Sequence, residues 1–302
     1  MHTIQPPFLQ ANDTIAIVAP AGKVDRTKVE ASIPVLESWG LRVKIMPHVY
    51  AENGSMAGTD SQRLQDIQEV LDNPEVKTIL CARGGYGSTR IIDQLDWTKF
   101  QKNPKWLIGF SDITAFLLHL NQMGYQSIHG PMGIHLFRED AQASTEMLRQ
   151  MMMGESLPQI QAPAHSGNRI GEAKGSVIGG NIALLASSIG TPSQLNTDGK
   201  ILFIEEIGEY PYTIDRMLGQ MQRAGLFNNL KGLVIGQFTD IKPNDGNPFP
   251  LSIEDIILEK VATYDYPVSF GMDIGHDQPN FPVICGAEAE LKVTEEGSEL
   301  SF

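Results

Sequence analysis

Strand-like and helix-like patterns of apolar and polar residues alternate along the first half of the chain. Short apolar runs have the length of buried strands, and longer segments repeat apolar residues at helical spacing. The predicted strands span 13–19, 41–46 and 77–82, and the predicted helices span 26–39, 60–71 and about 88–95. Pro34 is expected to kink the first helix, and Asp60 is placed to cap the second. The alternation predicts a doubly wound α/β domain with a parallel sheet.

The segment 105–123 continues this pattern and places a serine at a sharp corner. Ser111 and Asp112 interrupt a short apolar run, and apolar residues then recur at helical spacing. Gly109 has no Cβ and lets the chain fold back tightly. The segment resembles the G-x-S-x-G elbow that presents a nucleophilic serine, except that Ile113 replaces the second glycine. The alternative is that Ser111 or Asp112 only caps the helix.

The second half of the chain mixes strands and helices, and its topology is not readable. Residues 154–172 contain Pro, Gly and Ser with little periodicity and are interpreted as an interdomain linker. The predicted domains are therefore 1–153 and 173–302. In the second domain, strands are predicted at 200–207, 232–238 and, as the terminal strand, 286–293, and helices at 181–189, 212–223 and 253–263.

The composition limits the class of protein. The 302 residues suggest two domains, because single cores stop growing at roughly 250–300 residues. A net charge of −13 argues against nucleic acid and anionic membranes as partners. The sequence has no apolar run near the ~20 residues of a membrane span and no signal-peptide pattern at its N-terminus. Cys81 and Cys285, the only cysteines, are expected to be buried thiols, so we expect a cytoplasmic protein.

Three glycines, Gly84, Gly85 and Gly87, follow the third predicted strand. Neither the P-loop pattern nor the dinucleotide fingerprint is present, so the sequence predicts no nucleotide cofactor. One interpretation is a tight loop without a ligand. Beside a serine elbow, another use fits better: an N–H group of Gly84 or Gly85 would pair with that of Asp112 to form an oxyanion hole.

A nucleophilic serine needs a base, and three of the seven histidines are candidates. His276 lies in an irregular segment before the last predicted strand, and such segments often carry functional residues. His129 and His135 are the rivals, either as the base or as a weak metal pair. No Cys or acidic ligand lies near them in the sequence, so no metal site is predicted.

The base needs a carboxylate to orient it, and Glu205 and Glu206 follow an apolar run. Side chains alternate along a strand, so one of the two is expected to point into a site while the other faces water or a counter-ion. The alternative is a solvated acidic strand end. The residue pattern alone does not choose between these interpretations.

Seven short motifs lie along nearly the whole chain. They are A-R-G-G-Y-G-S-T-R at 82–90, G-F-S-D-I-T at 109–114, G-P-M at 130–132, G-G-N at 179–181, L-F-I-E-E-I-G-E at 202–209, I-D-R-M-L at 214–218 and G-H-D-Q-P-N at 275–280. Their order and spacing resemble the LD-carboxypeptidase family of serine peptidases and its relatives, the microcin C self-immunity peptidases.

The resemblance implies a Ser–Glu–His triad, in which Ser111 matches the nucleophile, Glu205 the carboxylate and His276 the base. The family's pattern continues with Asp where Glu206 stands here, a departure outside the catalytic position. The resemblance also implies a flavodoxin-like N-terminal domain, a smaller β-rich C-terminal domain, a site between them, a homodimer, and no metal or cofactor.

The implied substrate is a murein tetrapeptide, cut between the L-centre of its third residue and the terminal D-Ala during cell-wall recycling. Two alternatives stay open: a microcin-type immunity peptidase acting on an acyl-sulfamoyl adenylate, and a non-catalytic muropeptide-binding protein. A phosphate- or nucleotide-binding α/β protein is disfavoured because the P-loop lysine is missing.

Overall fold

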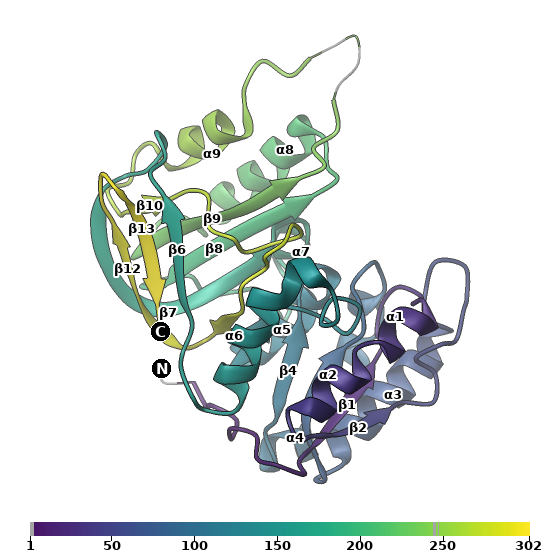
Figure 1. The fold of residues 1–302 in the computed structure, drawn as a ribbon. Coiled ribbons are helices and arrows are strands. Elements are labelled where there is room, and N and C mark those ends of the chain that lie inside the picture. Colours follow the sequence, from purple (N-terminus) through teal and green to yellow (C-terminus); the bar gives the residue numbers. More distant parts are fainter. Residues whose placement is uncertain (1–2, 244–245, 247) are drawn as a thin grey trace.

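Two sheets, one in each domain, organise the chain (Figure 1). The computed structural model describes residues 3–243, 246 and 248–302. The N-terminal sheet has six strands in the order β11-β5-β4-β3-β1-β2, all parallel except β11. These strands are β1 (Thr14–Val18), β2 (Arg42–Ile45), β3 (Val76–Cys81), β4 (Trp106–Gly109), β5 (Ser127–His129) and β11 (Val283–Cys285). The order 2-1-3-4-5 is the flavodoxin-like order, as predicted.

Helices cover both faces of the N-terminal sheet. On one face, α2 and α6 lie side by side, with Trp39 and Gln142 bordering the same shallow groove (Figure 1). On the other face, α5 packs against β3 and β4. The helices are α1 (Arg26–Glu30), α2 (Ile33–Ser38), α3 (Asp60–Asp72), α4 (Thr98–Lys102), α5 (Thr114–Gln122) and α6 (Gln142–Met152). Short 3₁₀ turns are η1 (Ser88–Arg90), η2 (Ile92–Gln94), η3 (Ser111–Ile113) and η4 (Glu139–Ala141).

Pro34 divides the predicted helix at 26–39 rather than kinking it. The structure has two helices, α1 and α2, and Pro34 lies in the first turn of α2. Proline has no N–H to donate, but the N–H groups of a first turn have no partner within their helix. Pro34 therefore fits the fold at this position because a new helix begins there.

Two other local predictions are wrong. Thr59, not Asp60, caps α3, because its hydroxyl accepts the N–H of Gln62 and the Gln62 side chain accepts the N–H of Thr59. The predicted helix at 88–95 is a pair of 3₁₀ turns, in which the backbone bonds close after three residues, as in the bond from the N–H of Arg90 to the carbonyl of Gly87.

The C-terminal sheet has seven strands in the order β10-β9-β8-β7-β12-β13-β6 and is mixed. Strands β7 to β10 are parallel. The other three pairs are antiparallel: β12 pairs with β7, β13 with β12, and β6 with β13. The strands are β6 (Gln159–Pro163), β7 (Gly171–Asn181), β8 (Ile201–Ile207), β9 (Gly232–Thr239), β10 (Val268–Ser269), β12 (Glu288–Val293) and β13 (Gly297–Ser301). The helices are α7 (Ile182–Ser187), α8 (Pro211–Arg223) and α9 (Ile253–Val261).

Three parts of the chain differ from the predicted linker, terminal strand and domain boundaries. The segment 154–172 is not irregular throughout, because β6 lies within it and pairs with β13 at the edge of the C-terminal sheet. Residues 286–293 are not the terminal strand, since β13 follows. From the C-terminal half, β11 returns to the N-terminal sheet and pairs with β5. Sequence periodicity could not find these pairings, because their partners lie far away in the chain.

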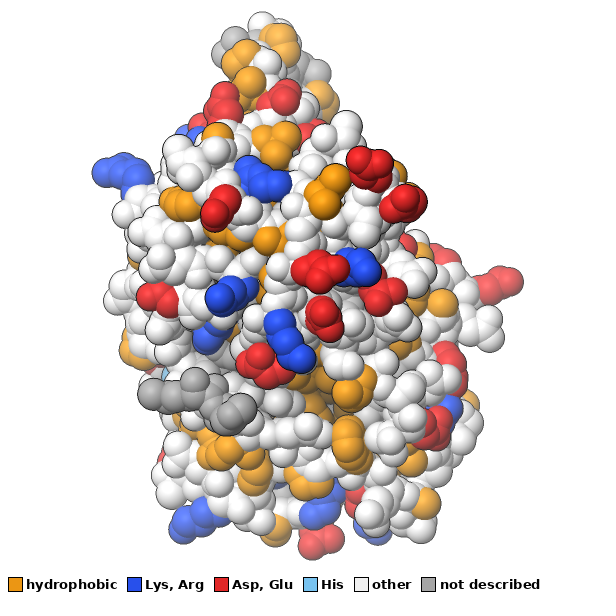
Figure 2. Space-filling view, turned by 90° about the vertical axis from the view of Figure 1, so that its left-hand side faces the viewer, with side chains coloured by type: hydrophobic (Ala, Val, Ile, Leu, Met, Phe, Trp, Pro, Cys, Tyr) orange, Lys and Arg blue, Asp and Glu red, His pale blue; other side chains and the backbone are white. Residues whose placement is uncertain are grey.

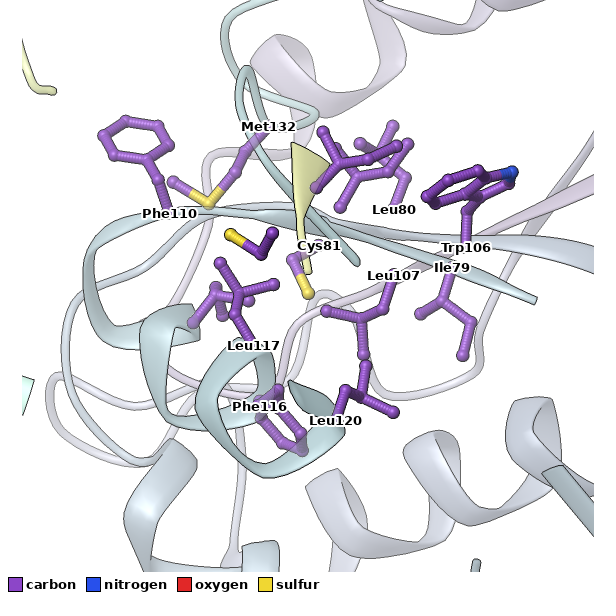
Figure 3. Packing of buried hydrophobic residues seen from close by; sticks show 14 of the residues in the cluster. Ile79, Leu80, Cys81, Trp106, Leu107, Phe110, Phe116, Leu117, Leu120 and Met132 are labelled. Carbon is purple, nitrogen blue, oxygen red and sulfur yellow. The ribbon is translucent and has the colours of Figure 1, made fainter. Parts of the chain in front are cut away.

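The buried core joins the two sheets. Figure 3 shows Phe116, Leu117 and Leu120 of α5 packed below the N-terminal sheet, with Phe110 and Met132 on its other side. Cys81 and Cys285 are buried free thiols, as predicted. On the face of the molecule that Figure 2 presents, acidic and basic side chains are interspersed. Among the described residues, no helix is long and apolar enough to cross a membrane.

Candidate active site

The serine elbow lies where β4 ends, at the carboxyl edge of the N-terminal sheet. Ser111 has φ of 62°, a left-handed conformation that is unusual for a residue with a side chain. A Cβ on Gly109 would lie 2.7 Å from Cγ2 of Ile113, so only glycine lets the following turn pack onto the strand. The predicted order of strand, sharp turn and helix is confirmed, with η3 between strand and helix.

The glycine-rich loop touches this elbow. A Cβ on Gly84 would lie 2.8 Å from the Ser111 Cβ and 3.3 Å from the Asp112 amide nitrogen. Asp112 Oδ2 accepts the Ser88 N–H at 2.9 Å, which ties the end of the loop to the elbow. Burial raises the pKa of this carboxyl, and the bond from Ser88 opposes the rise. Within the described residues, the N–H groups of Gly85 and Asp112 make no hydrogen bond.

His276 and Glu205 form a close pair. His276 Nδ1 lies 2.7 Å from Glu205 Oε2, and the Glu205 carboxylate is fully buried. The His276 ring packs edge-on against Phe110, the residue before the elbow serine, with ring centroids 4.9 Å apart. No hydrogen bond joins Ser111 to His276 in the described part of the chain, and such bonds are often long in ligand-free sites. Residues from both domains therefore meet around Phe110.

The loop that carries His276 is held by Gln237 of β9. Gln237 Oε1 accepts the N–H of Asp277 at 2.8 Å, and Gln237 Nε2 donates to the Pro279 carbonyl at 3.1 Å. Sequence analysis missed Gln237. Its signal was a polar residue at the end of a buried run, G-L-V-I-G-Q at 232–237.

Glu206 is buried as well, which corrects the expectation that one of the two glutamates faces water or a counter-ion. Glu206 Oε1 accepts the Asn181 Nδ2–H at 2.8 Å, and Oε2 accepts the Ala183 N–H at 3.0 Å. Burial, with a smaller contribution from the Glu205 charge, raises the pKa of Glu206 to about 7. Asn181 was also missed as a site residue. Its side chain caps α7 and also donates to Glu206.

Of the two rival histidines, His129 lies in the interior and His135 is partly exposed. His129 is fully buried in β5, where its ring packs edge-on against Phe203 with centroids 5.0 Å apart. Burial lowers the pKa of His129 to about 3 and that of His135 to about 4. The Nδ1 atom of His135 accepts the Met132 N–H at 3.3 Å within its own loop. Neither ring takes part in the contact with Glu205.

No candidate metal centre is present among the described residues, because no three side chains of His, Cys, Asp or Glu gather there closely enough to hold a metal ion. The pair of His129 and His135 therefore has no acidic or thiol partner in that part of the structure.

A cavity of roughly 630 Å³ opens beside Ser111. This volume lies in the range of small-molecule sites in proteins. Gly85, Ser111 and Asp112 form one wall, and Asn181 and Glu206 contribute to another. The cavity therefore lies between the two domains, next to Ser111 and to the N–H groups of Gly85 and Asp112, which have no partner among the described residues.

Two family models match the chain. Residues 15–130 match the LD-carboxypeptidase N-terminal domain, and residues 174–291 match the LD-carboxypeptidase C-terminal domain. The chain belongs to the LD-carboxypeptidase family of serine peptidases, as its motifs and its two-domain fold indicate.

Individual relatives extend the match to nearly the whole chain. A probable murein peptide carboxypeptidase of Bacillus subtilis (strain 168) is 34% identical, over 96% of this chain and 92% of its own length. The crystal structure of muramoyltetrapeptide carboxypeptidase from Oxalobacter formigenes is 31% identical, with a TM-score of 0.83, over 95% of this chain and 98% of its own. An MccF-like protein from Bacillus anthracis str. Ames is 25% identical, with a TM-score of 0.85, over 99% of both chains.

Proposed function

We propose that this protein is a serine-type LD-carboxypeptidase that removes the terminal D-Ala from murein tetrapeptides. The observation that carries the proposal is the 2.7 Å contact between His276 Nδ1 and Glu205 Oε2, beside a serine held at φ 62°. A nucleophile, a base and an orienting carboxylate are the groups that acyl transfer requires. Membership in the LD-carboxypeptidase family and the names of the relatives support the choice of substrate.

In the first half-reaction, Ser111 Oγ attacks the carbonyl carbon of the third residue while His276 Nε2 takes the hydroxyl proton. Glu205 accepts the Nδ1–H, which fixes the tautomer that leaves Nε2 free as a base. The negative charge on the carbonyl oxygen is stabilised by the N–H of Asp112 together with that of Gly85 or Gly84. His276 then protonates the D-Ala nitrogen, and the C–N bond breaks.

In the second half-reaction, water attacks the acyl-enzyme ester. His276 takes a proton from this water and returns one to Ser111 Oγ as the ester bond breaks. The products are a tripeptide and D-Ala. This sequence of steps needs no metal or cofactor.

A microcin-type immunity peptidase is the second candidate, because it would use the same three residues on an acyl-sulfamoyl adenylate. The similarity to the MccF-like structure supports the shared fold. A nucleobase would need an aromatic partner, and Tyr86, at the cavity mouth and 56% exposed, is the one aromatic side chain among the described lining residues. A non-catalytic muropeptide-binding protein would not need the paired Glu205 and His276.

Incubation with the tetrapeptide L-Ala-γ-D-Glu-X-D-Ala, where X is lysine or diaminopimelate, tests the proposal. We expect chromatography with mass spectrometry to find the tripeptide and free D-Ala. An acyl-sulfamoyl adenylate serves as the competing substrate. Cleavage of the adenylate with no cleavage of either tetrapeptide would favour the second candidate, and unchanged but bound tetrapeptide would favour the binding protein.

A further inference from the structure

A buried arginine of α3 lies against the glycine-rich loop. The side chain of Arg63 is fully buried, and its guanidinium donates through Nη1 to the Gly58 carbonyl at 2.7 Å and through Nη2 to Asp60 Oδ1. A Cβ on Gly87 would lie 3.2 Å from Nη2, so the loop backbone passes directly over the guanidinium. Arginine is almost never fully buried in proteins unless it is paired. Arg63 is therefore placed to act on the loop as well as on its own helix.

Arg63 shares its carboxylate partner with a second arginine. Arg90, at the end of the glycine-rich loop, binds both oxygens of Asp60, with Nε 2.9 Å from Oδ1 and Nη2 2.6 Å from Oδ2. The Arg90 side chain is 44% exposed, in contrast to Arg63. Among the described residues, no other carboxylate forms an ion pair with either arginine. Two positive charges thus face one negative charge, and the group keeps one positive charge in excess.

Asp112 of the elbow supplies a charge that balances this excess. Its side chain is buried and forms no ion pair in the described part of the chain. Burial raises the pKa of the Asp112 carboxyl, and the Ser88 N–H and the positive charge of Arg63 both oppose the rise. Hydrogen bonds accepted by an ionised carboxylate are roughly twice as strong as neutral ones. The bond that joins the loop to the elbow, from Ser88 to Asp112, therefore depends on the nearby arginine.

We propose that Arg63 is a positioning residue of the oxyanion hole, held in place by the Asp60–Arg90 pair. Its charge stabilises the ionised form of Asp112, which then holds the glycine-rich loop against the elbow. The N–H donors of the loop and of the elbow are thereby kept in one fixed arrangement. The inference rests on the proposed function and adds a residue outside the cavity. Because Arg63 is fully buried, it acts through these contacts and not on the substrate.

The middle of the loop depends on Arg63 more than its two ends do. At the first end, the Gly84 carbonyl accepts the Gly22 N–H at 2.9 Å, and at the other end Arg90 is bound to α3. Between them, Gly87 has φ of 140°, a conformation that favours glycine. The guanidinium fills the space below this point, so a side chain without it would leave the middle of the loop without support.

The test replaces Arg63 with methionine, which keeps much of its length without the charge, and with lysine, which restores the charge. We expect Arg63→Met to lower kcat for the tetrapeptide by about ten- to a hundredfold with little change in KM, because oxyanion donors act mainly in the transition state. Arg63→Lys should recover part of the loss. Arg169→Met is the matched control, because its guanidinium donates to the carbonyls of Tyr266 and Val261 away from the loop. It should leave kcat unchanged.

A double-variant cycle separates positioning from a general loss of stability. Arg63→Met is made in the wild type and in an Asp112→Asn variant, whose side chain has similar shape and no charge. If Arg63 acts through the charge of Asp112, its replacement should lower kcat by less than about threefold in the second background, because coupled residues are not additive. Effects that arise independently would instead multiply in the double variant.

Arg90→Gln provides a second variant that does not disturb the interior. We expect it to lower kcat by about two- to tenfold, because the loop end and Asp60 lose their contact. Arg149→Gln is its control, since this exposed arginine pairs with glutamates on and after α6. Wild-type kcat in Arg63→Met or in Arg90→Gln, or losses that multiply fully in the double variant, would overturn the inference and leave the proposed function intact. Absence of D-Ala release by the wild type would instead overturn the proposed function.

Discussion

His276 Nδ1 lies 2.7 Å from Glu205 Oε2, although 71 positions separate the two residues in the chain. Glu205 lies on β8, an interior strand of the C-terminal sheet, and His276 lies on a loop held by Gln237 of the neighbouring strand β9. Phe110, from the N-terminal domain, closes the pair on one side. The proposed base is therefore held by the C-terminal domain, whereas the proposed nucleophile, Ser111, belongs to the N-terminal domain.

The two adjacent glutamates are expected to respond differently to the same substitution. Glu205→Gln should lower kcat by about three to four orders of magnitude, because an amide can hold the imidazole in the wrong tautomer. Glu206→Gln should change kcat by no more than about tenfold, because Glu206 faces the cavity rather than His276. Steady-state kinetics on the tetrapeptide measures both. Small and equal losses would contradict the assignment of Glu205.

Gln237 is expected to act as a positioning residue. Gln237→Ala removes both hydrogen bonds to the His276 loop and should lower kcat by about ten- to a hundredfold with little change in KM, since small misplacements of a base are costly. Gln222→Ala is the matched control, because Gln222 Nε2 donates to the Lys260 carbonyl away from the site. Wild-type kcat in a Gln237→Ala variant with unaltered thermal unfolding would show that the loop does not need this support.

Local features of the site were readable from the sequence, and long-range ones were not. An apolar run, Ser111 and a helical pattern predicted the elbow correctly because the turn itself is shaped by near neighbours in the chain, Gly109 and Ile113. The bond from the Ser88 N–H to Asp112 comes from outside the segment and was not predicted. The sequence could not tell that Glu206 is buried, since this depends on Asn181, which approaches from β7. The return of β11 to the N-terminal sheet was missed for the same reason. Pro34 misled the prediction because a kink and a new helix start look alike in sequence.

Burial of Glu206 predicts a pH effect on stability. Its pKa is raised from the ordinary value of 4.5 to about 7, so the folded protein holds this proton more tightly than the unfolded chain does. The contribution of Glu206 to the free energy of unfolding should therefore be present below about pH 4.5 and be lost as the pH rises through about 7. Glu206→Gln should weaken this pH dependence, which thermal unfolding at several pH values measures. The same dependence in the wild type and in the variant would contradict the effect of burial.

Release of D-Ala by wild type and by Ser111→Ala tests the central claim most directly. Both proteins are incubated with the tetrapeptide, and the peptide mass is followed over time, with Ser38→Ala on the exposed face of α2 as a control. We predict that wild type and Ser38→Ala convert the tetrapeptide to the tripeptide, and that Ser111→Ala, with an unchanged circular dichroism spectrum, releases no detectable D-Ala. Release of D-Ala by Ser111→Ala at a rate near that of the wild type would show that Ser111 is not the nucleophile.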